Sequence, residues 1–196
     1  MTSIGRSVEM SRFHQCVLIV ATLALSWLGM QAVHEFGHVL GARLCGGQVA
    51  KVMLHPATIS YTKLAENPNP LLVTWLGPLV GIALPLVAFA IARYAKLPGW
   101  YLVQFFAGFC MVANGAFLAF GSFHRIGDAG DLLTHGTPIV LLWLFGLITI
   151  PIGLCLWNGL GSYFGLGASC GQVSRTATCI VLALLIAIVS LELALN

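Results

Sequence analysis

Charged residues are the scarcest feature of this sequence. Only 8% of its 196 residues are Asp, Glu, Lys or Arg, whereas soluble domains carry about 25%. Apolar residues make up 59% of the chain, and the mean hydropathy is +0.95. A soluble fold of this length could not hide so much apolar surface, and a disordered chain would need more polar residues to stay solvated. The composition therefore predicts a membrane protein in contact with the lipid bilayer.

Strong net charge and paired cysteines are also missing. The formal net charge of +3 is small and dispersed along the chain, which gives no sign of a nucleic-acid partner. None of the six cysteines forms a Cys-x-x-Cys pair, so we expect them to be structural rather than redox-active or metal-binding.

The gaps between the charged residues predict the membrane-spanning helices. Crossing about 30 Å of hydrocarbon takes about 20 helical residues. Five stretches without Asp, Glu, Lys or Arg run over 13–34, 67–92, 97–124, 132–174 and 176–191. We therefore predict helices near 16–43, 71–93, 100–121, 138–158 and 176–194. Residues 159–172 are rich in Gly and Ser and are expected to form a connecting loop. The predicted fold class is an all-α polytopic membrane protein with about five transmembrane helices, with four or six as alternatives.

The N-terminus has some features of a secretory signal peptide. Arg6 and Arg12 precede an apolar run that begins at Cys16. The run continues to His34 without a break, and no convincing small-x-small cleavage site follows it, so we expect an uncleaved first helix after a polar arm formed by residues 1–15. The expected location is that of a multi-pass integral membrane protein, in the cell membrane if the source is bacterial.

One segment departs from the helical pattern. Residues 48–61, QVAKVMLHPATISY, carry β-branched and aromatic side chains in partial alternation around Pro56. This pattern favours two short strands or a hairpin after the first helix. Because open strand edges cannot face lipid, we expect the hairpin to lie at the interface or against protein.

Three ionisable residues lie inside the first predicted helix. His34 and His38 are four positions apart and flank Glu35 in the segment His-Glu-Phe-Gly-His. On a helix, side chains four apart project from one face, so both imidazoles could bind one Zn²⁺, with Glu35 taking a proton from a metal-bound water. Ionisable residues at membrane depth are costly and usually functional. The alternative is a hydrogen-bonded cluster between helices without a metal.

A catalytic zinc site needs a third protein ligand from elsewhere in the chain. Asp128 and Asp131 lie in a short segment with Gly127 and Gly130, which would allow a close backbone approach or a sharp turn. Residues 122–135 are therefore predicted to form a loop that presents a metal ligand.

These residues resemble the site-2 protease family of intramembrane zinc metalloproteases. Members carry His-Glu-x-x-His in an apolar helix and a later Leu-Asp-Gly-Gly-x-x-Leu motif whose aspartate binds zinc. That motif is similar to residues 127–133 and places Asp128 at the ligand position. Gly77-Pro78 resembles a Gly-Pro element of the family. Because the aspartate motif here is degenerate, the alternative third ligands are Asp131, His124 and His135.

The resemblance covers residues 16–135, the expected metalloprotease core, and leaves 136–196 as two C-terminal helices. It implies one Zn²⁺ per chain, bound by His34, His38 and Asp128, with Glu35 as the general base. The implied reaction is hydrolysis of peptide bonds in a membrane-anchored protein substrate. Strand addition of that substrate to the predicted hairpin is a further hypothesis. The alternative functions are a metal transporter and an inactive, protease-like regulatory subunit. The oligomeric state stays open.

Overall fold

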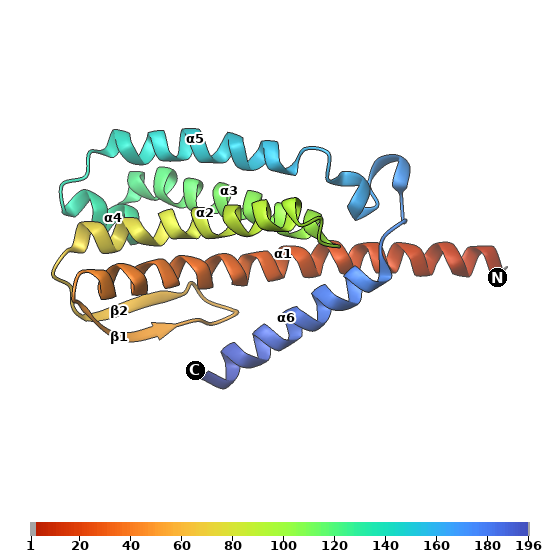
Figure 1. The fold of residues 1–196 in the computed structure, drawn as a ribbon, viewed down its shortest axis with the longest axis horizontal. Helices are drawn as coiled ribbons and strands as arrows, with labels where there is room; N and C mark the ends of the chain where they lie inside the picture. Colours follow the sequence, from red (N-terminus) through yellow and green to blue (C-terminus); the bar gives the residue numbers. More distant parts are fainter. Residues whose placement is uncertain (1–2, 196) are drawn as a thin grey trace.

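Most of the chain is helical, and most of its long helices lie side by side along the long axis of the molecule (Figure 1). The computed structural model describes residues 3–195 and the side chains of residues 11–194. The helices are α1 (Ser3–Leu44), α2 (Pro70–Tyr94), α3 (Trp100–His124), α4 (Gly127–Thr134), α5 (Ile139–Trp157) and α6 (Arg175–Leu195). Two strands, β1 (Gln48–Met53) and β2 (Tyr61–Glu66), follow α1, and two short 3-10 helices, η1 (Gly161–Phe164) and η2 (Gly167–Ser169), precede α6.

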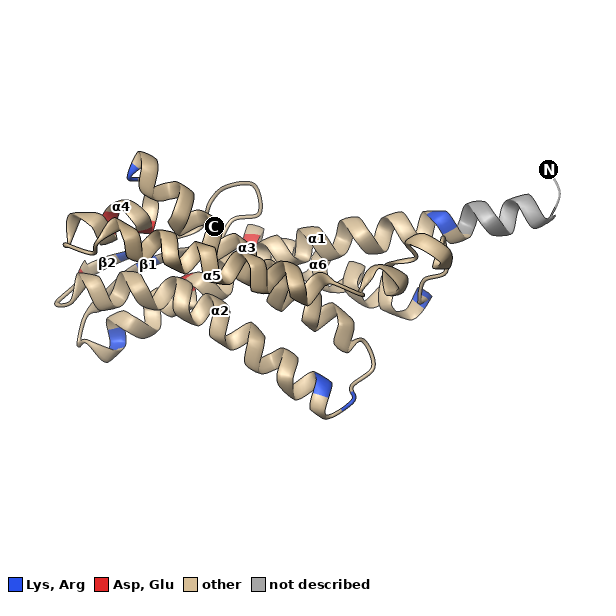
Figure 2. Cartoon of the chain, turned by 90° about the horizontal axis from the view of Figure 1, so that it is seen from above, with Lys and Arg blue, Asp and Glu red and all other residues tan. Residues whose placement is uncertain are grey.

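Five of these helices are long and apolar enough to cross a membrane, counted over the described residues. They are the 11–44 part of α1, together with α2, α3, α5 and nearly all of α6. Basic residues lie towards the ends of the helices (Figure 2), as expected where helix centres lie in hydrocarbon. The predicted fold class, an all-α polytopic membrane protein with a hairpin after its first helix, is confirmed.

The helices are arranged in layers. α5, α3, α2 and α1 lie in that order across the molecule, and α6 crosses α1 obliquely on the side of the hairpin (Figure 1). α3 and α5 approach closely where both have glycine, since a Cβ added at Gly153 would lie 2.7 Å from the Gly108 carbonyl oxygen. Small residues allow such backbone contact between membrane helices. The resulting bundle surrounds the middle and C-terminal half of α1.

Several element boundaries differ from the predicted ones. The first helix begins at Ser3, so residues 3–15 form its first turns rather than a separate arm. At about 1.5 Å per residue, its 42 residues span about 63 Å, twice the hydrocarbon thickness. The segment predicted as a loop, 122–135, contains the end of α3 and the whole of α4. Helix α4 packs against its neighbours through Ala129 and Leu132. These two residues form one buried cluster with Leu118 of α3 and Leu142 of α5.

The hairpin begins at the predicted position but extends beyond its predicted bounds of 48–61, to Glu66. β1 and β2 pair antiparallel, with Met53 opposite Tyr61 and Val52 opposite Thr62. The segment between them holds Pro56, which lacks the N–H that a central strand position requires. The second strand therefore begins at Tyr61, where the prediction ended, and extends to Glu66. Figure 1 shows the hairpin lying along the C-terminal half of α1.

Candidate metal centre

The His-Glu-Phe-Gly-His segment lies in the C-terminal half of α1, facing the interior of the bundle. The exposed fractions of His34, Glu35 and His38 are 8%, 6% and 8%, whereas Phe36 between them is 50% exposed. This division follows from helical spacing, which places positions 34, 35 and 38 on one side and position 36 on the other. Possible ligand atoms of the three buried residues lie within 4.8 Å of one another.

The two imidazoles are oriented by hydrogen bonds on their Nδ1 atoms. His34 Nδ1 lies 2.6 Å from Asn114 Oδ1 of α3, and His38 Nδ1 lies 2.9 Å from the Val73 carbonyl oxygen of α2. Both partners accept, so each Nδ1 carries the donated proton. The two Nε2 atoms then face each other at 3.1 Å. Metal-binding histidines use this arrangement, with one ring nitrogen held by an acceptor and the other directed at the metal.

Asp128 brings a carboxylate to the same point. Its Oδ2 atom lies 2.7 Å from His34 Nε2 and 3.3 Å from His38 Nε2. A tetrahedral Zn²⁺ with bonds of 2.0–2.1 Å holds its ligand atoms about 3.3 Å apart. The three donor atoms are thus spaced closely enough to share one ion after small side-chain movements. Two imidazole nitrogens and a carboxylate oxygen also form a donor set that zinc accepts in catalytic sites.

The surroundings of Asp128 keep its carboxyl group ionised. Burial alone raises the pKa of this group, but His34 and His38, which donate to it and carry positive charge when Nε2 is also protonated, outweigh burial and hold the pKa below its ordinary value. Helix α4 fixes the position, because Ala129 and Leu132 beside the aspartate are fully buried. An anionic oxygen is therefore present at the point where a cation would bind.

Glu35 lies beside this donor set and has a partner of its own. Its Oε2 atom accepts a hydrogen bond of 2.7 Å from the Thr62 hydroxyl of β2. The hairpin therefore contacts the proposed general base directly. A carboxylate oxygen of Glu35 also lies within 4.8 Å of ligand nitrogens of His34 and His38, close to the atoms that converge from His34, His38 and Asp128.

Glycine residues allow α1 and α2 to pack closely beside the His38 imidazole. A Cβ added at Gly77 would overlap the His38 ring, and one added at Gly37 would overlap the Leu76 carbonyl oxygen. Glycine at both positions lets the helices approach until the Val73 carbonyl reaches His38. The Gly77-Pro78 pair noted in the sequence thus lies at the wall of the site.

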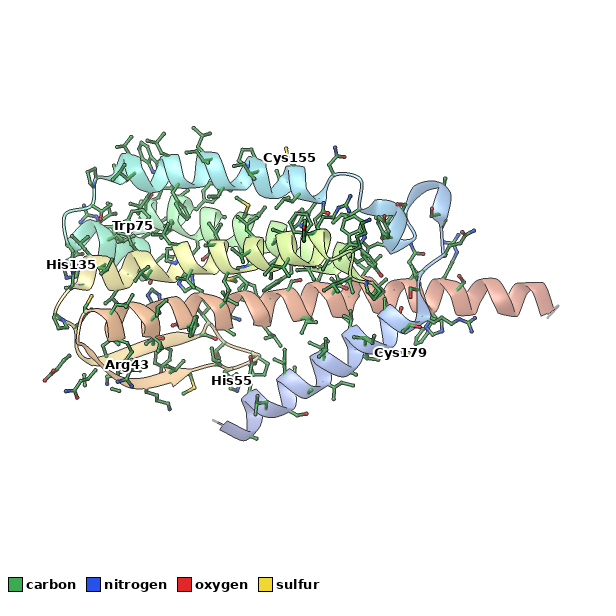
Figure 3. All side chains as sticks on the ribbon, in the orientation of Figure 1. Arg43, His55, Trp75, His135, Cys155 and Cys179 are labelled. Atoms are coloured by element: carbon green, nitrogen blue, oxygen red, sulfur yellow. The ribbon has the colours of Figure 1, made fainter. Side chains whose placement is uncertain are left out.

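The alternative third ligands lie away from the convergent atoms. Asp131, His124 and His135 are exposed, and His135 Nδ1 donates to the Asp131 carbonyl oxygen at 2.8 Å. Figure 3 shows His135 at the edge of the molecule. Asp131 does line the same cavity as the histidines, but no described contact joins its carboxylate to either imidazole.

Two further polar residues contact the site from distant segments. Asn114 is the amide deep in the apolar helix α3, a position that by itself favours a role in helix packing over one in orienting a substrate. The structure shows that it also holds His34, 80 residues away. Thr62 gave no signal, because threonine is common in exposed strands.

A cavity of about 950 Å³ opens beside these groups. Its walls come from the site itself, from β2 and from α1, and include His34, Glu35, His38, Thr62, Asn114 and Asp128. This volume is within the range of pockets that hold small ligands or a short stretch of peptide. The arrangement can therefore place a ligand against a carboxylate and a possible metal position at once.

Comparisons of this chain with protein-family models, with curated proteins and with solved structures found no match.

Proposed function

We propose that this protein is an intramembrane zinc metalloprotease that hydrolyses peptide bonds of membrane-anchored protein substrates. The observation that carries the proposal is the meeting of His34 Nε2, His38 Nε2 and Asp128 Oδ2 beside the buried carboxylate of Glu35. These converging atoms lie among helices that are long and apolar enough to span a membrane. The setting supports a multi-pass integral membrane protein with one Zn²⁺ per chain.

The donor set has the composition expected of a catalytic zinc site, with three protein ligands. Such an ion, when bound, supplies a Lewis acid and lowers the pKa of a coordinated water to about 7. Glu35 is the group that takes a proton from the attacking water and then delivers it to the leaving nitrogen. Asn114 and the Val73 carbonyl hold the two imidazoles in the tautomer that leaves Nε2 available.

The hairpin supports a polypeptide as the substrate. β2 pairs with β1 on one side only, and residues 61–64 of β2 line the cavity. An extended peptide could therefore hydrogen-bond to β2 while its backbone passes Glu35. A peptide bond inside a helix is shielded by its own hydrogen bonds, so the substrate must be unwound locally before cleavage. Strand addition remains a prediction, for which proline substitutions along β2 are the test.

Removal of the metal tests the proposed function. We expect the purified protein in liposomes to contain about one zinc per chain and to cleave members of a panel of single-span membrane proteins. A zinc chelator should abolish cleavage, and added Zn²⁺ should restore it, because the ion bound by His34, His38 and Asp128 is the Lewis acid of the proposed reaction. Metal analysis and mass spectrometry of the products measure the two quantities.

A non-chelating isomer of the same chelator is the control and should leave cleavage unchanged. Cleavage that persists after complete zinc removal would contradict the proposal. A protein that binds zinc but cleaves no member of the panel would instead favour the alternative of a metal-binding membrane protein without protease activity.

Gly77→Ala is expected to weaken zinc binding by about 10- to 100-fold, the usual cost of disturbing groups that orient a ligand. The added Cβ would overlap the His38 ring and displace its Nε2 from the shared position. Competition with a zinc indicator of known affinity measures the change. Gly161→Ala is the matched control, because its Cβ would lie 3.6 Å from its nearest neighbour, Leu166 Cβ, which is an ordinary van der Waals distance. Equal zinc affinity in the two variants would show that Gly77 does not position His38.

A further inference from the structure

Gln31 is a buried polar residue that the mechanism above does not use. It lies one turn before Glu35 on α1, is 6% exposed and lines the cavity beside the site. Its Oε1 atom accepts a hydrogen bond of 2.7 Å from the Ser60 backbone N–H. Its Nε2 atom is buried and has no hydrogen-bond partner among the described residues.

An amide nitrogen left in this state needs an explanation, because buried polar groups are nearly always hydrogen-bonded. The bond to Ser60 fixes which end of the Gln31 amide is the oxygen, since only the oxygen can accept from an N–H. The nitrogen is therefore held as a donor in a residue that lines the cavity, although the nitrogen itself is shielded from water. An acceptor that arrives with a ligand would satisfy it.

The surroundings indicate the chemistry of that acceptor. Three carboxyl groups line the cavity, those of Glu35, Asp128 and Asp131, against the single ammonium group of Lys63. With the proposed Zn²⁺ counted as well, these charges sum to about zero, so the cavity does not attract an anion and a neutral acceptor suits it. A backbone carbonyl is the neutral acceptor that every residue of a peptide carries.

The spacing along α1 indicates which carbonyl it would be. Gln31 and Glu35 are separated by one turn, or about 6 Å of helix rise, and an extended chain covers that distance in about two residues. The chain at the start of β2 already has this spacing. Ser60, just before the strand, contacts Gln31, and Thr62, two residues later, contacts Glu35. An extended peptide lying alongside would have carbonyls at the same interval.

We propose that the Gln31 side-chain amide donates a hydrogen bond to a backbone carbonyl of an extended peptide substrate, about two residues from the bond that faces Glu35. This inference rests on the proposed protease function and assigns Gln31 as a substrate-positioning residue. Because Nε2 is shielded from water, the neighbouring side chains must move apart when the peptide binds.

A double-mutant cycle between protein and ligand tests the proposal. The ligands are short peptide hydroxamates, each compared with analogues in which one backbone amide is replaced by a trans-alkene that keeps the shape and removes the carbonyl. Equilibrium dissociation constants are measured on the zinc-loaded, full-length protein and on Gln31→Met. For one analogue position, we expect the substitution to weaken binding of the parent hydroxamate about 2- to 10-fold and to leave binding of that alkene analogue unchanged.

Gln31→Glu provides a second variant, because its carboxylate keeps the acceptor for the Ser60 N–H and loses the donor. It should show the same selective loss, which separates the donor from the anchoring of the hairpin. Equal losses for the parent and every alkene analogue would overturn the role of Gln31 and leave the protease proposal standing. Failure of all hydroxamates to bind the zinc-loaded wild-type protein would instead overturn the proposed function, and this inference with it.

Discussion

Glu35→Gln should abolish peptide cleavage while leaving the zinc content unchanged. Glutamine keeps the shape of the side chain and can still accept the hydrogen bond from Thr62, but its amide cannot take a proton from water. General base catalysis contributes about 10²- to 10⁴-fold to such reactions, so we expect a loss of activity of that size. Zinc content is measured by metal analysis, and cleavage is measured on a membrane-anchored substrate with the same preparation.

Glu66→Gln is the matched control for this substitution. Glu66 carries the same chemical group on β2, but it is exposed, and its carboxylate accepts a hydrogen bond of 3.3 Å from the Gln48 side-chain amide. Cleavage by Glu66→Gln should match the wild-type rate. Full activity of Glu35→Gln would show that the reaction does not need the Glu35 carboxylate. Loss of zinc from Glu35→Gln would indicate that Glu35 is a metal ligand rather than a base.

Asp128→Asn should lower both zinc affinity and cleavage by about 100-fold or more, beyond the range found for groups that only support a ligand. The substitution keeps the size of the side chain but removes the negative charge at 2.7 Å from His34 Nε2 and 3.3 Å from His38 Nε2. A neutral amide oxygen is a weaker ligand for zinc than a carboxylate. Zinc titration and cleavage assays on one preparation show whether the two losses occur together.

Asp131→Asn makes the same chemical change one turn further along α4. Its carboxylate is exposed and has no described contact with the imidazoles, so we expect zinc affinity close to that of the wild type. Zinc loss in Asp131→Asn without zinc loss in Asp128→Asn would transfer the ligand role to Asp131. Loss in neither variant would show that the third ligand is neither aspartate.

The local features of the site could be predicted because they depend on spacing along one helix. His34 and His38 share a face of α1 as a consequence of the helical repeat, and the low charge count made Glu35 between them conspicuous. The five apolar stretches likewise predicted the spanning helices, since hydrocarbon admits few charged residues. The strand after α1 was recognised from its alternation, although its second half extended to Glu66.

Tertiary packing decided what no spacing in the sequence could show. Asn114 meets His34 across 80 positions, and Asp128 meets it across 94. Thr62 reaches Glu35 only because the hairpin folds back along α1, and Asp128 contacts the imidazoles because of the way α4 packs. The sequence by itself determined the membrane setting and the pair of histidines, because both depend on local composition and the helical period. Only the packing of the helices brings distant segments into contact. That packing places the Asp128 carboxylate and the partners that orient the imidazoles, and it buries the Gln31 amide nitrogen without a partner among the described residues.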